Sequence, residues 1–296
     1  SDDFDQLNRL HPLDYTEIGD TNLYEHGETT ADFFPIVDNM INFNPDVTLI
    51  GYALDDDRPV AGQTLRLRLS WQINTAPDGP VGLNISLIDP DGTPIASALP
   101  TLGQSIWQTD TLDTYHALRL NSDVEPGLLS LQVTVEYRAG IVGRSTLTQL
   151  VTPFDIDLPT QQGIAQLGDV ELHATQITPD DNQLSVATTW SVTQPLKDDY
   201  LLFMHLTPLD NFAPVSQSDG PPISGRFPTS QWLPGEGVID ERQIPLAEVA
   251  PGQYQIRVGF YLLDGTRLSD ENSDAITIAQ VAINADGEII ITYPND

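Results

Sequence analysis

The chain has 296 residues, enough for about two domains. Its 43 acidic and 12 basic residues give a formal net charge of −31 at pH 7. This charge excludes binding to nucleic acid, whose phosphates need lysine and arginine, and docking on anionic membrane surfaces. No run of about 18 apolar residues occurs, so we expect no membrane insertion. The absence of cysteine excludes disulfides and cysteine-based metal sites.

The acidic residues are mostly aspartate. The chain has 32 Asp but 11 Glu and a single lysine, Lys197. Helix surfaces favour Glu and Lys, whereas Asp favours turns and strand ends. The 23 prolines and 21 glycines add further turn residues. The composition therefore predicts an all-β protein.

Residues 1–39 form an N-terminal extension without a counterpart elsewhere in the chain. Apolar residues at helical spacing predict a short amphipathic helix near its start, and aromatic residues follow in a polar background. A solvated tail would not need so many large apolar groups. We therefore expect the extension to pack on a sandwich of its own chain or of an adjacent subunit. The residues expected at an inter-subunit contact are Phe4, Leu7, Leu10, Tyr24, Phe33 and Phe34.

Two related modules follow, at 40–156 and 163–296. Trp71 and Trp190 stand in similar contexts 119 residues apart, and a Pro-Gly pair followed by an alternating apolar run recurs after 125 residues. Such self-similarity predicts an internal duplication of a unit of about 115 residues.

Each module alternates apolar and polar residues with a period of two, as at 81–87 and 254–260, and turn residues separate the runs. Seven or eight short strands in this pattern predict two tandem immunoglobulin-like β-sandwich domains. The stretch 288–294 has no counterpart in the first module. It predicts an extra C-terminal edge strand, bounded by Glu288 and Pro294.

Residues 198–268 carry a series of short motifs: Asp-Tyr, Phe-x-His-Leu, Asp-Gly-Pro-Pro, Pro-Thr-x-x-Trp and Pro-Gly-x-Tyr. In this the chain resembles tandem immunoglobulin-like β-sandwich modules of surface and membrane-anchored proteins of environmental bacteria. The first module keeps Trp107 and the Pro-Gly pair but lacks the histidine and the Asp-Gly-Pro-Pro stretch. The resemblance implies an accessory or architectural role and supplies no active-site residues.

The four tryptophans suit either a sugar-stacking platform or the core of a sandwich. Each has a counterpart at the equivalent place in the other module, which favours a requirement of the fold. We therefore predict Trp71 and Trp190 as core residues, and favour the core for Trp107 and Trp232 too.

Calcium is the only cofactor with a candidate site. Asp89 and Asp91 match the first half of a calcium-binding loop, but no bidentate glutamate follows at the required spacing. The same residues are typical of a hairpin turn with Gly92 at positive φ. Asn84 begins an Asn-Ile-Ser sequon on the outward face of its predicted strand, which makes it a candidate glycosylation site.

No catalytic residue is expected. The five histidines form no His-Glu-x-x-His motif, and neither a Gly-x-Ser-x-Gly nor a P-loop sequence occurs. His205 lies in the middle of a predicted strand, where a structural role is favoured over that of a base.

These observations predict an extracellular or cell-surface structural protein, exported with removal of a signal peptide. We expect a homo-oligomer: a pilus-like filament assembled head-to-tail through the N-terminal extension. The alternatives are a carbohydrate-binding or adhesion module, with glycans as partners, and an accessory domain of a larger surface protein.

Overall fold

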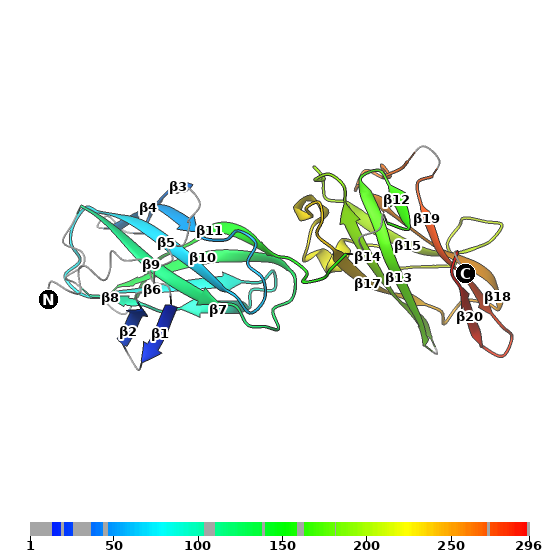
Figure 1. Ribbon diagram of the computed structural model, residues 1–296, viewed down its shortest axis with the longest axis horizontal. Helices are drawn as coiled ribbons and strands as arrows, with labels where there is room; N and C mark the ends of the chain where they lie inside the picture. The colour runs from blue at the N-terminus through cyan, green and yellow to red at the C-terminus, as the bar shows by residue number, and fades with distance from the viewer. Residues whose placement is uncertain are drawn as a thin grey trace. The chain divides into compact units, whose positions relative to one another are not determined.

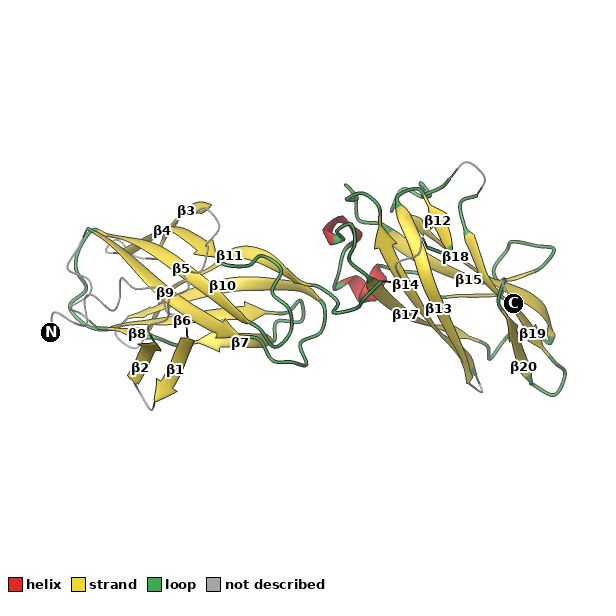
Figure 2. Ribbon diagram, in the orientation of Figure 1, coloured by secondary structure: helices red, strands yellow, loops and turns green. Residues whose placement is uncertain are grey.

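A computed structural model describes residues 14–18, 21–25, 37–43, 47–103, 110–137, 140–158, 163–180, 182–270 and 273–294. The chain divides into two compact units, Ser1–Thr152 and Pro153–Asp296. Antiparallel strands make up almost all of the regular structure in both units (Figures 1 and 2). The predicted all-β class is therefore confirmed.

The first unit contains two antiparallel sheets. Its strands are β3 (Val37–Asn42), β4 (Val47–Leu54), β5 (Thr64–Ile73), β6 (Val81–Ile88), β7 (Pro94–Ala98), β8 (Thr101–Leu102), β9 (Thr111–Arg119), β10 (Gly127–Tyr137) and β11 (Gly140–Thr152). One sheet has the order β3-β4-β5-β9 and the other β11-β10-β6-β7, with β8 also paired to β6. Buried residues of both sheets belong to one hydrophobic cluster, so the core lies between them.

The second unit also contains two antiparallel sheets. Its strands are β12 (Ala165–Leu167), β13 (Val170–Asp180), β14 (Gln183–Val192), β15 (Leu201–Pro208), β16 (Ser216–Gln217), β17 (Val238–Pro245), β18 (Gly252–Tyr261), β19 (Ile276–Ile283) and β20 (Ile289–Thr292). The sheets have the orders β12-β13-β14-β17 and β16-β15-β18-β19-β20. Two single-turn 3-10 helices, Pro222–Gly225 and Thr229–Gln231, lie in the connection from β16 to β17.

The strand order of the second unit repeats that of the first. In each unit one sheet has four strands, in the order β3-β4-β5-β9 in the first unit and β12-β13-β14-β17 in the second. In the other sheet, the antiparallel pairs β6-β7 and β15-β16 occupy the same place at one edge. The first unit has the additional short strand β8, and the second unit has β20, which extends its larger sheet as an outermost strand beside β19. It lies within the stretch 288–294 that the sequence marks as an extra strand.

Period-two alternation explains why these segments form strands with one buried face. In β5 the side chains of Leu65, Leu67, Leu69 and Trp71 are buried, while the intervening arginines are only partly so. In β14 the buried residues Leu184, Val186, Thr188 and Trp190 alternate in the same way. Each sheet therefore turns one face inward, and burying two such faces together stabilises each unit.

Trp71 and Trp190 are each fully buried in the core of their unit. The Trp71 ring lies 6.0 Å from that of Phe43, and its Nε1–H donates to Thr114 Oγ1 at 3.0 Å. The Trp190 ring meets the Phe260 ring edge-on at 5.0 Å, and its Nε1–H donates to Thr188 Oγ1 at 2.7 Å. A buried indole needs such a partner for its N–H group.

Trp232 is also fully buried, although it lies in a connection rather than in a strand. Its ring packs perpendicular to Phe260 at 6.1 Å, and its Nε1–H donates to Phe227 O at 3.1 Å. Phe260 therefore packs against both Trp190 and Trp232. The first-module counterpart of this residue, Trp107, lies outside the described residues.

The N-terminal extension differs at its end from the sequence-based boundary. Strand β3 begins at Val37, which pairs with Tyr52 of β4, so residues 37–39 belong to the first unit's sheet. Further upstream, β1 (Asp14–Ile18) and β2 (Thr21–Glu25) form a hairpin. Among the described strands this hairpin pairs only with itself. The short helix expected around Phe4 lies outside the described residues.

His116 of β9 is buried and joins the group around Trp71. Its Nε2 lies 2.8 Å from Thr114 Oγ1, the same oxygen that accepts from Trp71. Burial lowers the pKa of His116 to about 3 because the charged imidazolium loses its hydration. The imidazole is therefore neutral in the folded protein at neutral pH.

Replacing a core tryptophan tests the packing of its unit. We expect Trp71→Ala or Trp190→Ala to lower the free energy of unfolding of its own unit by about 3–5 kcal/mol, because each removes a fully buried indole. Urea unfolding followed by circular dichroism measures the change. Phe212→Ala is the control, since Phe212 is 64% exposed, and it should cost no more than about 0.5 kcal/mol. A comparable cost for all three variants would contradict this packing.

The buried neutral histidine makes the first unit sensitive to acid. Unfolding restores an ordinary histidine pKa of 6.5. Below that pH, His116 is therefore protonated in the unfolded state but still neutral in the folded state. The contribution of His116 is complete above pH 6.5 and is lost as the pH falls toward 3. Between pH 6.5 and 5 we expect wild type to lose about 1.5 kcal/mol more unfolding free energy than His116→Gln. Urea unfolding at both pH values measures this difference, and equal losses would refute it.

Candidate functional site

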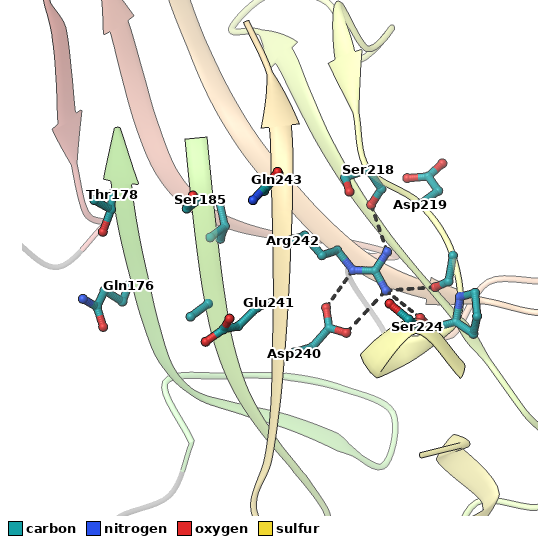
Figure 3. Close-up of a pocket in the computed structure, with 14 residues that line it drawn as sticks. Gln176, Thr178, Ser185, Ser218, Asp219, Ser224, Asp240, Glu241, Arg242 and Gln243 are labelled. Atoms are coloured by element: carbon teal, nitrogen blue, oxygen red, sulfur yellow. Dashed lines mark hydrogen bonds and ion pairs between the residues drawn. The ribbon is translucent and has the colours of Figure 1, made fainter. Parts of the chain in front are cut away.

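A recess of about 720 Å³ lies on the second unit, over the outer face of β13, β14 and β17 (Figure 3). The connection that follows β16 borders it with residues 218–221 and Ser224. Small-molecule pockets in proteins commonly have volumes of about 300–1,000 Å³. The recess is therefore large enough for a ligand, and we take it as the candidate site.

The floor of the recess consists of side chains that the three strands present on their outer face. The strand register aligns them in two rows that run across the sheet. The rows are Thr178, Ser185 and Gln243, and Gln176, Ala187 and Glu241. Residues between them, such as Leu184 and Val186, point into the core. The alternation that builds the core thus also builds a largely polar floor.

A buried ion pair on the edge strand β17 holds the wall of the recess, which is formed by residues 218–224. Arg242 Nε donates to Asp240 Oδ2 at 2.7 Å, and the two side chains are only 8% and 1% exposed. Both residues follow Val238 on the buried side of β17, where an apolar residue would be expected. Such a pair is tolerated when hydrogen bonds satisfy its remaining donors and acceptors.

The connection after β16 supplies those hydrogen bonds. The Arg242 guanidinium donates from Nη1 to Ser218 O at 3.2 Å, and from Nη2 to Gly220 O at 3.0 Å and Pro221 O at 3.1 Å. The Ile223 N–H donates to Asp240 Oδ1 at 2.6 Å. The ion pair therefore fixes the path of residues 218–223 through their backbone, as Figure 3 shows for Arg242.

The fixed segment contains an unusual backbone conformation. Ile223 and Ser224 have φ values of 50° and 54°, in the left-handed region that favours glycine. A β-branched residue such as isoleucine is strained there, at a cost of about 1–3 kcal/mol. The bond from the Ile223 N–H to buried Asp240 offsets this cost, so the shape of the wall depends on the ion pair.

Asp219 ties the same segment to the second sheet. Its Oδ1 accepts from the Met204 N–H at 3.2 Å, and its Oδ2 lies 3.2 Å from His205 Nε2. Two motifs of the resemblance, Phe-x-His-Leu and Asp-Gly-Pro-Pro, therefore meet in this contact. Tyr261 lies in the same region. Its pKa is raised, first by burial and then by the charge of Asp219, while Arg242 acts in the opposite direction.

The inter-subunit residues expected from the sequence lie almost entirely beyond the described ranges. Phe4, Leu7, Leu10, Phe33 and Phe34 fall outside them, and Tyr24 belongs to β2, where its backbone pairs with that of Tyr15. Their expected contact therefore stays a prediction.

The calcium candidates lie in a hairpin turn between β6 and β7. Asp89 Oδ1 accepts from the Thr93 N–H at 2.7 Å, and Gly92 has φ +85°. Asp91 in the same turn is exposed. Within the described ranges, no group of three or more His, Asp or Glu side chains is placed to hold a metal ion. Calcium binding at this turn stays a prediction.

The sequon residue Asn84 lies in the middle of β6 and is half-buried. Its Oδ1 accepts from Ser86 Oγ at 2.6 Å. The side chain thus belongs to the outer face of its strand, and it is also engaged in a local hydrogen bond. Glycosylation at this position stays a prediction.

The recess residues were not singled out from the sequence, although one signal was present. Asp240 and Arg242 occupy alternate positions on the stripe that also carries buried Val238 and Ile244. Opposite charges at core positions of a strand indicate a buried ion pair. The floor rows could not be recognised in this way, because they depend on which strands lie side by side.

Comparisons with known proteins add little to this description. No model of a known protein family matches the chain, and no curated protein matches it. Among solved structures, that of a DUF4785 family protein from Legionella pneumophila is similar, with 16% sequence identity and a TM-score of 0.24. The match covers 73% of this chain and 52% of that protein, so the chain spans about half of its length. This similarity is too weak to support a functional inference.

In the part of the chain that the structure describes, no helix is long and apolar enough to cross a membrane.

The ion pair predicts a specific effect of a charge-conserving substitution. We expect Arg242→Lys to lower the free energy of unfolding of the second unit by about 2–3 kcal/mol, because an ammonium group cannot reach Asp240 and three carbonyl oxygens together. The Ile223 amide should then exchange its hydrogen faster. Arg267→Lys is the matched control, since Arg267 pairs with Asp274 but is 39% exposed, and it should change stability by no more than about 0.5 kcal/mol. Equal effects of the two substitutions would contradict the role of the ion pair in holding residues 218–223.

Proposed function

We propose that the chain is an extracellular, non-catalytic structural protein that assembles head-to-tail into a surface filament through its N-terminal segment. In this proposal the two units are immunoglobulin-like sandwiches related by duplication, of the kind found in bacterial surface and membrane-anchored proteins. They act as spacers, and the segment before β3 joins one subunit to the next. The observation that carries the proposal is the separate pairing of the hairpin β1-β2.

The strand registers support the duplication. Trp71 pairs with Leu49, and the register between β4 and β5 shifts directly after this pair. Trp190 pairs with Leu172, and the register between β13 and β14 shifts at the same place. A second shift follows Leu131 in β10 and Ile256 in β18, which stand 125 residues apart like the two Pro-Gly pairs. Bulges are specific features of a sheet, so their recurrence supports common descent.

The hairpin supports the assembly. A segment that folded back as an extra strand of its own sandwich would pair with an edge strand of the first unit. The described hairpin instead makes its strand pairs within itself, between Asp14–Ile18 and Thr21–Glu25. A two-stranded hairpin is marginally stable in water. It gains stability from a partner surface, and the edge of a sheet in a neighbouring subunit offers one.

The geometry of such a contact leads to a filament. A segment at one end of the chain that docks on a surface elsewhere makes a heterologous contact, which continues from subunit to subunit unless the rotation closes a ring. The charge of −31 opposes this association through repulsion between subunits. At physiological ionic strength, salt limits this repulsion to a range of about 8 Å. We therefore expect assembly at physiological salt and not at low salt.

Deleting the segment before β3 tests the proposal. We expect the variant lacking residues 1–36 to remain monomeric at physiological salt, while the full chain associates as its concentration rises. The deletion ends before Val37 so that β3 stays paired with β4. Analytical ultracentrifugation measures the association, and an unchanged melting temperature would show that both units still fold.

A second variant separates the contact from the loss of chain length. It carries alanine at all six expected contact residues in the full-length protein, and it too should stay monomeric. The six residues are Phe4, Leu7, Leu10, Tyr24, Phe33 and Phe34. The filament proposal is wrong if the unmodified chain sediments as a monomer at high concentration, or if both variants associate as it does.

A further inference from the structure

The floor of the recess carries polar side chains that have no partner among the described residues. Five of them make no hydrogen bond or ion pair with any other described residue. They are Gln176, Thr178, Ser185, Glu241 and Gln243. Each of the two side-chain amides offers a donor and an acceptor, and each of the two hydroxyl groups can both donate and accept. Such a surface suits a ligand that is itself rich in groups able both to donate and to accept.

The spacing of these groups sets the size of the ligand. Neighbouring strands lie about 4.8 Å apart, and residues two positions apart on one strand are separated by about 6.5–7 Å. The two rows cross three strands, so the polar groups cover an area of about 10 by 7 Å. This area is extended and shallow. It fits two or three linked rings lying flat on the sheet better than a single small ion.

The charges of the recess argue against an anionic ligand. Among the described residues that line it, Arg242 is the only basic one, and its guanidinium already donates to Asp240 and to three backbone carbonyls. Asp219 is engaged with Met204 and His205. Glu241 adds a negative charge to the floor, in a chain whose net charge is −31. An anion would therefore meet repulsion without a free cation to bind it.

From these observations we propose that the recess of the second unit binds a neutral oligosaccharide, two or three sugar units of which lie across β13, β14 and β17. The sugar hydroxyls hydrogen-bond to the two glutamines, the two hydroxyl side chains and the Glu241 carboxylate. The site shares no residue with the N-terminal segment that is proposed to join the subunits. Binding and assembly can therefore succeed or fail separately.

The wall of the recess contributes to binding because it is preorganised. Residues 218–223 are held by the buried ion pair before any ligand arrives, so little conformational entropy is lost when a sugar contacts them. None of the described residues that line the recess is aromatic, so none stacks on a sugar ring. We therefore expect millimolar affinity, which depends on several hydrogen bonds made together.

A titration of the full chain with defined sugars tests the proposal. The neutral probes are cellohexaose, xylohexaose, mannohexaose and maltohexaose, and the charged probes are hexagalacturonate and the hexamer of glucosamine. Amide shifts in nitrogen-15 NMR spectra report both affinity and location. We expect at least one neutral hexasaccharide to shift amides of β13, β14 and β17 at lower concentration than either charged probe. The proposal fails if no neutral probe shifts these amides, or if the shifted amides lie elsewhere.

Matched substitutions then assign the contacts. Gln176→Ala with Gln243→Ala removes one amide from each row and should raise Kd about tenfold or more. Gln280→Ala is the control, because Gln280 is an exposed glutamine on β19 of the opposite sheet, and it should leave Kd unchanged. Unchanged binding by the double variant would overturn the proposed site.

Substitution of Glu241 separates a neutral ligand from a cationic one. Glu241→Gln keeps the shape and the hydrogen bonding of the side chain but removes its charge. A neutral sugar should bind this variant within about threefold of wild type. Binding of the glucosamine hexamer alone, with a loss of about tenfold or more in this variant, would show that the recess recognises positive charge and would refute the proposal.

Discussion

The buried pair of Asp240 and Arg242 is the interaction on which the outer surface of the second unit depends. A buried charge is costly unless it is paired and its hydrogen bonds are satisfied. Here the edge strand provides the pair, and the backbone of residues 218–223 provides the remaining partners. The same contacts offset the strain at Ile223 and place the wall beside the floor. One electrostatic requirement thus determines the path of a connection that has little regular structure of its own.

The equivalent positions in the first unit satisfy the same constraint without charge. The strand registers place Thr114 where Asp240 stands and His116 where Arg242 stands, since Leu67 pairs with His116 as Val186 pairs with Arg242. Thr114 and His116 are also buried and hydrogen-bonded to each other. The first unit lacks the Asp-Gly-Pro-Pro stretch whose carbonyls would satisfy an arginine. A neutral pair suits its edge strand, at the cost of sensitivity to acid.

Local sequence patterns were sufficient for the features that depend on one strand or one turn. Alternation identified the strands, and the repeated context of Trp71 and Trp190 indicated their place in the core. The turn at Asp89 and the extra strand at 288–294 follow from residues adjacent in the chain. The start of β3 was missed because Val37 lies in a segment without a recognisable repeat, and only its pairing with Tyr52 defines it. The sequence did not indicate the floor of the recess for a similar reason. Gln243 lies beside Ser185 only because β14 and β17, which are distant in the chain, pair in this register.

The longer connection after β16 has a consequence for how such a protein can diversify. Equivalent strand positions are 119 residues apart at Trp71 and Trp190 but 126 apart at Leu112 and Val238, so seven extra residues lie between them. Added loop length costs little stability, because the closure entropy grows only slowly with the number of residues. The connection and the two positions on the edge strand that hold it, 240 and 242, thus form a structural element that can be transferred to another sandwich. Grafting it onto the first unit, with Asp and Arg at positions 114 and 116, would give both units the same connection on an unaltered scaffold.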